Sequence, residues 1–348
     1  MSASLLRSRP LQALMDMTAR DQKWLVLISP DPDALASALA LKRILARRVE
    51  SVVISAIFPI SRPDNLAMVR YLRIPVRQWA PEARSWFDRY ALVDSQPHHN
   101  TAFSGIQFDV VVDHHPLDLE HPVTAACTDI QPDMGATSTI FAGYLKSLGI
   151  RPGVRLATAL QYGIRTDTAA FTRKLAAADI RTYQQLTKYS DTALLTRIMR
   201  SEYLLPWLKY FTRAFATLHL MGRGGFSFPG EVEAADLLVV IADFFSRVNG
   251  LEWIAVAGVC RDAIHLESGK VVIIFRGDGR NDMGAFAREK FGDLGTAGGH
   301  RMMARAEFPL ENIEEGRQAE AFIFRRLSQH VPAGAARQKK NKEQHSAQ

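Results

Sequence analysis

The chain has 348 residues, of which 47% are hydrophobic, and its formal net charge is +7. This length supports two domains with separate cores. The sequence contains no apolar run of about 18 residues and no long apolar N-terminal segment, which excludes a transmembrane helix and a secretory signal. Cys127 and Cys260 lack metal-ligand spacing, so we expect two small core residues and no disulfide. These features predict a cytoplasmic protein with no membrane partner.

The positive charge is unevenly distributed along the chain. Residues 331–348 contain four lysines and arginines against one glutamate, so this tail contributes +3 and the rest of the chain about +4. The composition of the tail predicts a disordered basic segment. A mildly basic body favours an anionic substrate without requiring long nucleic acid.

Short apolar runs alternate with helical patterns in the N-terminal half of the chain. Such alternation predicts an α/β fold with a mostly parallel sheet covered by helices on both faces. The expected strands are 24–28, 51–58, 74–78, 90–93 and 108–112, and the expected helices are 5–20, 34–48, 62–72, 135–148 and 154–162.

The first strand ends in a Pro-Asp-Pro-Asp segment, residues 30–33. Each proline disfavours the helical region for the residue before it, so we expect Asp31 to be extended and Asp33 to be the N-cap of the next helix. Two carboxylates so placed can face a shared cation. The alternative interpretation is that Asp33 only caps the helix and that Asp31 is solvated.

Further acidic and imidazole side chains follow other elements. Asp94 follows the strand 90–93, Asp113-His114-His115 ends the strand 108–112, and Asp167 follows the helix 154–162 and Gly163. Ligands of open α/β sheets bind outside the carboxyl ends of the strands. Carboxylates with one or two imidazoles suit Mn²⁺ or Mg²⁺. Each residue alone is explained by capping or solvation, but their coincidence at element ends favours a metal site.

Five segments resemble, in order, the motifs of the DHH phosphoesterase family, which includes nanoRNase-type oligoribonucleases, RecJ-type exonucleases, family II pyrophosphatases and cyclic-dinucleotide phosphodiesterases. The resemblance covers roughly residues 20–170. It implies hydrolysis by metal-activated water with one or two Mn²⁺ or Mg²⁺ ions. The segments are PDPDALAS (30–37), VDS (93–95), VVDHHP (111–116), GATSTI (135–140) and GIRTDT (163–168).

The same resemblance implies roles for the site residues. It implies that His115 contacts the substrate phosphate and that Asp113 supports the histidines. The implied ligands are Asp31 and Asp94 for one ion, and Asp33, the bridging Asp94, His114 and Asp167 for the second.

One position departs from the family pattern. Leu27 stands where the family usually has a histidine, four residues before the first aspartate. Because leucine cannot bind a metal, the first ion would lack a ligand. A weaker first ion, a single ion, a substitute such as His98 or His99, and an inactive protein are the alternatives.

The C-terminal half predicts a helical region and then a second, smaller α/β domain. A strand that ends in Arg276 and a later glycine-rich segment with Gly298, Gly299 and His300 resemble the DHHA1 domain, which implies that these four residues bind the substrate. Ala297, Met303 and Arg305 depart from the family pattern and leave the substrate open. The expected elements are helices 176–221, 234–248, 283–291 and 313–329, strands 253–259, 270–275 and 303–308, and loops 222–230 and 292–300.

The predicted organisation is a DHH phosphoesterase domain (1–185), a helical connector (186–228), a DHHA1-like substrate-binding domain (229–330) and the basic tail. The expected activity is Mn²⁺-dependent hydrolysis of short single-stranded oligonucleotides, linear dinucleotides or nucleotide phosphates such as 3′-phosphoadenosine 5′-phosphate, in a cleft between the domains. The alternative is a metal-deficient nucleotide-binding or regulatory protein of the same fold. The sequence leaves open RNA against DNA, cleavage polarity and oligomeric state, a homodimer included.

Overall fold

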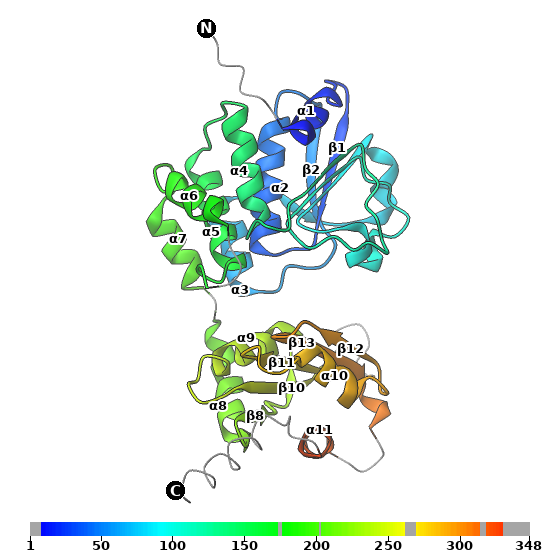
Figure 1. Ribbon diagram of the computed structural model, residues 1–348, viewed down its shortest axis with the longest axis vertical. Helices are drawn as coiled ribbons and strands as arrows, with labels where there is room; N and C mark the ends of the chain where they lie inside the picture. Colours follow the sequence, from blue (N-terminus) through cyan, green and yellow to red (C-terminus); the bar gives the residue numbers. More distant parts are fainter. Residues whose placement is uncertain (1–7, 173–175, 202, 262–268, 314–317, 330–348) are drawn as a thin grey trace, which may run out of the picture. The chain divides into compact units, whose positions relative to one another are not determined.

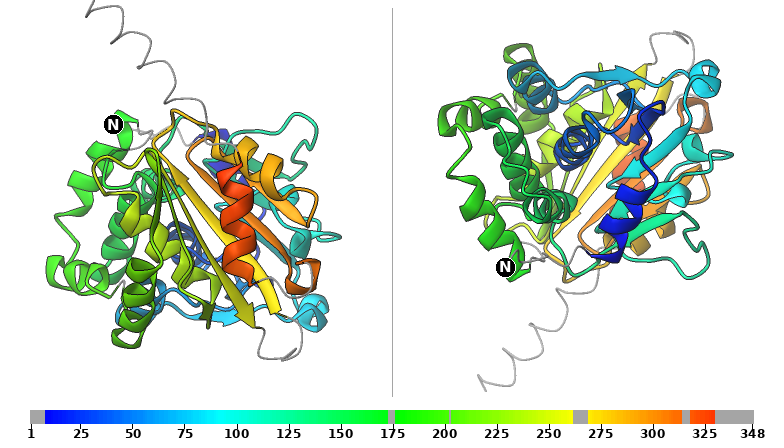
Figure 2. Two further views of the ribbon diagram at one scale, coloured as in Figure 1. Left: turned by 90° about the horizontal axis from the view of Figure 1, so that it is seen from below. Right: turned by 90° about the horizontal axis from the view of Figure 1, so that it is seen from above.

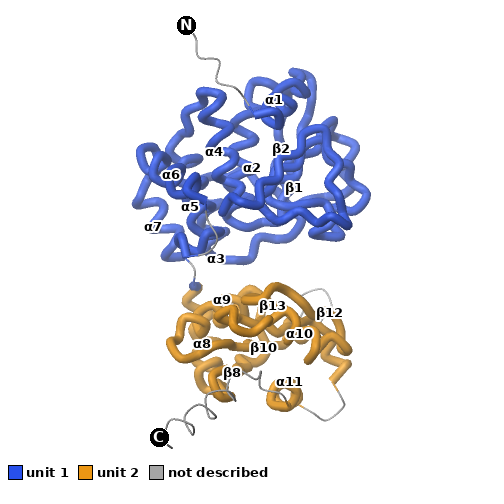
Figure 3. The backbone as a smooth tube through the Cα atoms, viewed as in Figure 1, with its two compact units in different colours: residues 1–203 blue, residues 204–348 orange. Residues whose placement is uncertain are grey.

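The computed structural model describes residues 8–172, 176–201, 203–261, 269–313 and 318–329 (Figure 1). The chain divides into two units, residues 1–203 and 204–348 (Figure 3). The predicted basic tail lies outside the described residues. Within the described ranges, no helix is both long and apolar enough to cross a membrane. Cys127 and Cys260 are free thiols in different units.

The first unit contains a sheet of six parallel strands in the order β3-β2-β1-β4-β5-β6. Strands that are buried on both faces read as continuous apolar runs, which explains why most of them are visible in the sequence. The strands are β1 (Lys23–Ile28), β2 (Ser51–Ala56), β3 (Val76–Gln78), β4 (Arg89–Val93), β5 (Val110–Asp113) and β6 (Cys127–Ile130).

The two faces of this sheet are covered differently. Trp24, Val26 and Ile28 pack against the α-helices, whereas Leu25 and Leu27 face a cluster formed by short 3₁₀ segments and loops. Figure 2 shows α2, α4 and α5 together on one side of the strands. The helices are α1 (Arg9–Asp16), α2 (Pro32–Leu45), α3 (Pro63–Leu72), α4 (Thr137–Ser147), α5 (Val154–Asp167), α6 (Ala177–Leu186) and α7 (Thr192–Met199), and the 3₁₀ segments are η1 (Pro81–Trp86), η2 (Pro97–His99) and η3 (Thr101–Phe103).

The strand order fixes the position of the site. From β1 the chain adds β2 and β3 on one side and later adds β4, β5 and β6 on the other. A crevice forms outside the carboxyl ends of the strands where the order reverses, between β1 and β4. The Pro-Asp-Pro-Asp segment and Asp94 follow these two strands.

Three expectations for the first unit need correction. Strand β6 was not predicted, because only one side of this four-residue strand is buried. Helix α5 continues through Gly163 to Asp167, so this aspartate ends a helix and does not lie in a loop. The N-cap of α2 is Asp31, because Pro32 occupies the first helical position, where its missing N–H costs nothing.

The second unit contains a mixed seven-stranded sheet in the order β12-β13-β11-β10-β8-β7, with β9 paired to β10. Helices α10 and α11 pack on one face and α8 and α9 on the other. The elements are η4 (Leu205–Trp207), α8 (Leu208–Ala216), β7 (His219–Met221), β8 (Gly224–Ser227), β9 (Glu231–Val232), α9 (Ala235–Phe245), β10 (Trp253–Arg261), β11 (Gly269–Gly277), α10 (Met283–Phe291), β12 (Thr296–Gly299), β13 (Met303–Pro309), η5 (Leu310–Asn312) and α11 (Ala319–Ser328).

Two segments that were expected as loops contain strands. Residues 222–230 include β8, which pairs with β10. Gly224 of β8 lies against the Trp253 ring of β10, where a Cβ would come within 1.9 Å of a ring carbon. Residues 292–300 include β12, which pairs with β13. The residues expected as a connector, 186–228, divide between the units, because α7 packs in the core of the first and α8 in that of the second.

Candidate active site

Asp31 and Asp33 lie at the start of α2, directly after β1. The Oδ1 atom of Asp31 accepts a hydrogen bond from the backbone N–H of Ala34 at 2.8 Å, which caps the helix. Asp33 is the second residue of the helix and is completely buried. Asp31 itself is extended, as expected, with φ −128° and ψ 176°, and both carboxylates lie at the start of α2.

The carboxylate of Asp33 lies at the N-terminus of α4. It accepts hydrogen bonds from the backbone N–H groups of Thr137 (2.6 Å) and Ser138 (2.8 Å). The anion at this glycine- and hydroxyl-rich turn is therefore Asp33. Helix N-termini favour negative charge, so α4 fixes the Asp33 side chain.

Asp94 follows β4 in a strained backbone conformation. Its φ is +60°, a region that residues other than glycine rarely adopt and that is enriched at functional sites. The hydroxyl of Thr137 donates to Asp94 Oδ1 at 2.7 Å, while Asp94 Oδ2 is buried without a hydrogen-bond partner. The strand end and α4 thus hold one carboxylate oxygen and leave the other available.

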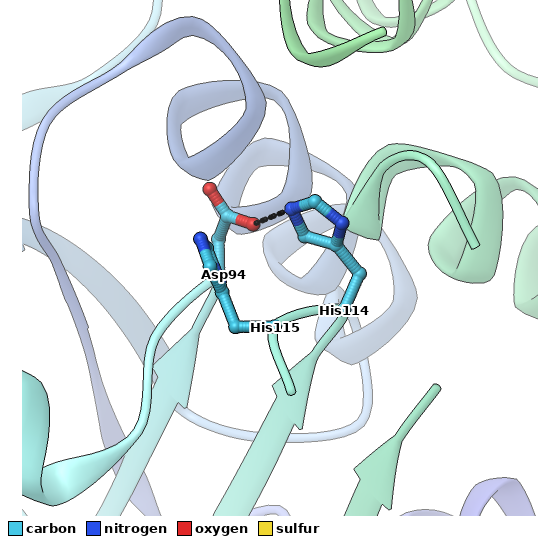
Figure 4. A group of neighbouring side chains, drawn as sticks. All are labelled: Asp94, His114 and His115. Atoms are coloured by element: carbon cyan, nitrogen blue, oxygen red, sulfur yellow. Dashed lines mark ion pairs between the residues drawn. The ribbon is translucent and has the colours of Figure 1, made fainter. Parts of the chain in front are cut away.

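His114 follows β5 and faces two carboxylates. Its Nδ1 lies 3.3 Å from the carbonyl oxygen of Met134, so Nδ1 carries the proton and Nε2 is the free nitrogen of the neutral ring. This Nε2 lies 3.1 Å from Asp167 Oδ2. It also lies 3.6 Å from Asp94 Oδ1 (Figure 4). A lone pair that faces two carboxylates requires a proton or a metal ion between them.

The pKa values of the cluster reflect the same crowding of carboxylates. Burial, followed by the charge of Asp167, raises the pKa of Asp31 to about 7 and that of Asp33 to about 6. Burial and the charges of Asp33 and Asp31 also raise the pKa of Asp94. Burial alone would lower the pKa of His114, but the close carboxylate of Asp167 and the charges of the neighbouring carboxylates outweigh this effect and raise it to about 9.

These observations fit a divalent cation. Ligand atoms of Asp33, Asp94, His114 and Asp167 all lie within 4.8 Å of one another, and the buried Asp94 Oδ2 and His114 Nε2 lack hydrogen-bond partners. Three carboxylates and one imidazole are a donor set for Mn²⁺ or Mg²⁺. Asp31 belongs to the same electrostatic neighbourhood, because the charges of Asp167 and Asp33 raise its pKa.

Asp113 and His115 form a separate hydrogen-bonded pair beside this cluster. His115 Nδ1 lies 2.8 Å from Asp113 Oδ1. The buried amide of Gln96 donates to the other oxygen, Asp113 Oδ2, at 2.9 Å. The ring of His115 lies 4.6 Å from that of His114 between centroids. Asp113 therefore orients His115, and each of its two oxygens accepts a hydrogen bond.

Leu27 offers no ligand to the site. Its side chain is completely buried in the apolar cluster with Leu25, Leu92 and Phe103. His99 does not replace the missing histidine, because its Nδ1 accepts a hydrogen bond from the backbone N–H of Gln96 at 3.2 Å. The neutral ring then carries its proton on Nε2, which removes the lone pair that a metal needs.

The four predicted substrate-binding residues all lie in the second unit. Arg276, near the end of β11, donates through Nε to Asp243 Oδ1 at 2.6 Å and through Nη1 to the carbonyl of Phe275 at 3.1 Å. These bonds hold the guanidinium in one orientation and leave its Nη2 side available.

The glycine-rich segment forms the hairpin between β12 and β13. Gly299 has a φ of +142°, and a Cβ there would lie 2.4 Å from the Met303 carbonyl, so the hairpin itself requires glycine. Gly298 has space for a side chain, with Arg288 Nη1 3.6 Å from a built Cβ. His300 is exposed in the turn.

Some contributors to the site were missed in the sequence. Gln96 gave no signal beyond its place two residues after Asp94, and the contact of Thr137 with Asp94 depends on tertiary packing. Gly163 permits a close approach of neighbouring elements, because a Cβ there would lie 2.5 Å from Ser138 Oγ and 3.0 Å from Asp33 Oδ1.

The first unit is thus a parallel α/β sheet with a buried carboxylate–imidazole cluster at its strand ends, an arrangement that could hold a divalent ion. Residues 26–164, in the N-terminal unit, match the model of the DHH family, N-terminal domain. Members of the family are metal-dependent hydrolases.

Relatives and solved structures extend the comparison. The chain is 30% identical over 285 residues to the uncharacterized protein MJ1633 of Methanocaldococcus jannaschii. The aligned residues are 81% of this chain and 57% of MJ1633, so this chain spans little more than half of that relative's length.

Two crystal structures share the fold at low identity. One is an exopolyphosphatase-related protein from Bacteroides fragilis (14% identity, TM-score 0.69, covering 92% of this chain and 95% of that chain). The other is RecJ from Thermus thermophilus in complex with Mn²⁺ (15% identity, TM-score 0.52, covering 94% of this chain and 56% of that chain).

Proposed function

We propose that this protein is a metal-dependent phosphoesterase that hydrolyses short single-stranded oligonucleotides, linear dinucleotides or nucleotide phosphates such as 3′-phosphoadenosine 5′-phosphate. The observation that carries the proposal is the convergence of Asp33, Asp94, His114 and Asp167 from four chain segments. The match to the DHH family model supports the reaction class. Such nucleotide substrates fit the cytoplasmic location expected from the sequence.

The residues of the site would have different roles in this reaction. Asp33, Asp94, His114 and Asp167 would hold a divalent ion, Mn²⁺ or Mg²⁺, with Asp31 beside them. When bound, such an ion activates a water and neutralises phosphate oxygens. The helix α4 and the Thr137 hydroxyl hold the carboxylates in place.

His115 would contact the phosphate, because its side chain is 43% exposed beside a buried cluster. Asp113 orients the His115 ring and stabilises its protonated form, since the hydrogen bond and charge of Asp113 outweigh burial and raise the pKa of His115. A protonated ring can donate to a phosphate oxygen. In the second unit, Arg276, Gly298, Gly299 and His300 are proposed to bind the substrate, as the resemblance to DHHA1 domains implies.

Leu27 supports a second candidate, a metal-deficient nucleotide-binding or regulatory protein of the same fold. Asp31 lacks the histidine partner that the family carries, and the buried leucine cannot replace it. We therefore propose one strongly held ion at the four-residue cluster and a weaker or absent second ion at Asp31. Leu27→His is expected to strengthen the weaker site in a calorimetric Mn²⁺ titration, and an unchanged affinity would contradict this account.

The proposed activity is tested with labelled RNA of two to five nucleotides and with 3′-phosphoadenosine 5′-phosphate, each with and without Mn²⁺. We expect Mn²⁺-dependent hydrolysis, and a loss of roughly 100-fold or more in Asp94→Ala because a ligand is removed. Asp118→Ala is the matched control, since Asp118 is a solvent-facing carboxylate outside the cluster. Retained nucleotide binding without turnover in the wild type would favour the regulatory candidate.

A further inference from the structure

A second group of potential ligands lies next to the proposed metal cluster. Atoms of His99, Asp113 and His115 lie within 4.8 Å of one another, and the rings of His99 and His115 meet edge to face with centroids 5.4 Å apart. His99 ends the short segment η2, between β4 and β5, and is exposed. It takes no part in the proposed metal cluster.

The hydrogen bonds of this group are those of an oriented network and not those of a metal site. Both oxygens of Asp113 have partners, His115 Nδ1 on Oδ1 and Gln96 Nε2 on Oδ2. On His99, Nδ1 accepts the backbone N–H of Gln96 at 3.2 Å and lies 3.3 Å from the Ser95 hydroxyl. Both oxygens of Asp113 and the Nδ1 of His99 are thus engaged in hydrogen bonds within the protein.

Gln96 sets the orientation of both rings. It is completely buried, and its Nε2 faces three acceptors: Asp113 Oδ2, the His115 carbonyl (3.3 Å) and the Pro116 carbonyl (3.2 Å). Three acceptors around one atom identify that atom as the amide nitrogen. The side chain of Gln96 thus acts on His115 through Asp113, while its backbone N–H acts directly on His99.

The two rings consequently present different groups. The N–H of Gln96 keeps Nδ1 of His99 unprotonated, so the proton of the neutral ring is on Nε2. The carboxylate of Asp113 keeps the proton of His115 on Nδ1, so Nε2 of its neutral ring is an acceptor. His99 therefore offers a fixed N–H donor beside His115, whatever the charge of either ring.

We propose that His99 is a further substrate-binding residue, whose Nε2–H donates to an oxygen of the phosphate ester bound next to His115. This inference rests on the proposed phosphoesterase function and adds an element of substrate recognition to it. The donor serves an anionic oxygen beside the proposed metal cluster. Gln96 is then a positioning residue for both imidazoles.

Two substitutions separate a donor role from a structural role. His99→Asn keeps an acceptor near the Nδ1 position for the N–H of Gln96 but removes the donor, whereas His99→Gln can place an amide N–H near the Nε2 position and loses the acceptor. A structural role predicts that the asparagine is tolerated and the glutamine is harmful. The donor role predicts the reverse. His121→Ala is the matched control, because this exposed ring stacks on His98 outside the group.

The probe is a fluorescently labelled RNA dinucleotide with a phosphorothioate linkage, titrated by anisotropy with the Mn²⁺-loaded full chain. We expect His99→Asn to weaken binding about tenfold or more, and His99→Gln to remain within about threefold of the wild type. His121→Ala should bind like the wild type. Unchanged binding in His99→Asn, or equal losses in the asparagine and glutamine variants, would overturn the inference.

Hydrolysis of the unmodified dinucleotide distinguishes a failure of the His99 proposal from a failure of the proposed phosphoesterase function. If the wild type hydrolyses it and His99→Asn binds the probe normally, only the role of His99 is wrong. If the wild type neither hydrolyses the dinucleotide nor binds the probe, the proposed function fails, and the role of His99 fails with it.

Discussion

The individual side chains of the metal cluster oppose one another without a cation. Asp33 and Asp94 are buried, and the neutral ring of His114 turns its lone pair toward Asp94 and Asp167. Protons bound by Asp31, Asp33 and His114 relieve this repulsion below their raised pKa values of about 7, about 6 and about 9, and a divalent ion relieves it once these protons are lost. The stability of the first unit should therefore depend on both.

Metal-free protein should lose thermal stability as the pH rises from about 4 to about 9. Asp31 and Asp33, with pKa values raised to about 7 and about 6, retain protons that the unfolded chain releases above its ordinary pKa of 3.8. His114, with its pKa raised to about 9, contributes stability that is complete below pH 6.5 and is lost as the pH rises through 9. Both effects have the same sign.

The measurement is the melting temperature in EDTA across this pH range, where we expect a fall on the order of 5 °C or more. Asp94→Asn is the comparison, because it removes one charge and keeps the acceptor for Thr137, so its fall should be smaller. Stability that increases with pH, equally in both proteins, would show that the cluster is not charged as described.

At the level of elements, the site depends on how closely α2, α4 and α5 approach. Gly163 in the middle of α5 allows Asp33 of α2 and Ser138 of α4 to lie against its backbone. Helix propensity disfavours glycine in this position, so close packing of the three helices is its physical reason. By contrast, a Cβ built on Gly143 in α4 would have no neighbouring atom within 4 Å.

Gly163→Ala should displace the Asp33 carboxylate and lower Mn²⁺ affinity by roughly 10- to 100-fold, as expected when the support of a ligand moves. It should also cost about 1–3 kcal/mol of unfolding free energy through overpacking. Gly143→Ala, the matched control, should gain about 0.5–1 kcal/mol by helix propensity and leave Mn²⁺ affinity unchanged. Urea unfolding and calorimetric Mn²⁺ titration measure both quantities, and equal affinities in the two variants would refute the packing argument.

At the scale of the whole molecule, the chain has two units with separate hydrophobic cores. The clusters around Trp24 and Leu25 belong to the first unit, and those around Phe275 and Trp207 belong to the second. All residues of the proposed metal cluster lie in the first unit. Metal binding should therefore act on one unit.

Differential scanning calorimetry should show two transitions, of which Mn²⁺ raises only one. At 100 times the dissociation constant, a ligand adds about 2.7 kcal/mol, equivalent to roughly 5–10 °C for a unit of this size. Asp94→Ala should abolish the shift without changing the other transition. A single transition that moves as a whole would contradict independent units.

The sequence predicts the buried strands and the long helices because their apolar periodicity is strong. It does not predict β6, β7, β8, β9 or β12, because strands of two to four residues carry too little periodicity, and β8 and β12 also contain glycines that resemble loops. Gly224 is informative: alone it indicates a turn, and only the neighbouring Trp253 makes it part of a strand. The expected N-cap at Asp33 was wrong for a similar reason, since either aspartate is a suitable cap.

By itself, the sequence determined the alternation of strands and helices and the placement of acids and imidazoles at their ends, because local patterning and residue chemistry are properties of short segments. Only the tertiary structure decided which of these side chains meet. The reversal of strand order between β1 and β4 brings Asp33 and Asp94 together, and α4 and α5 add Thr137 and Asp167. Contacts such as those of Thr137 with Asp94 and Asp33, 43 and 104 positions away, depend on packing, which no local pattern encodes.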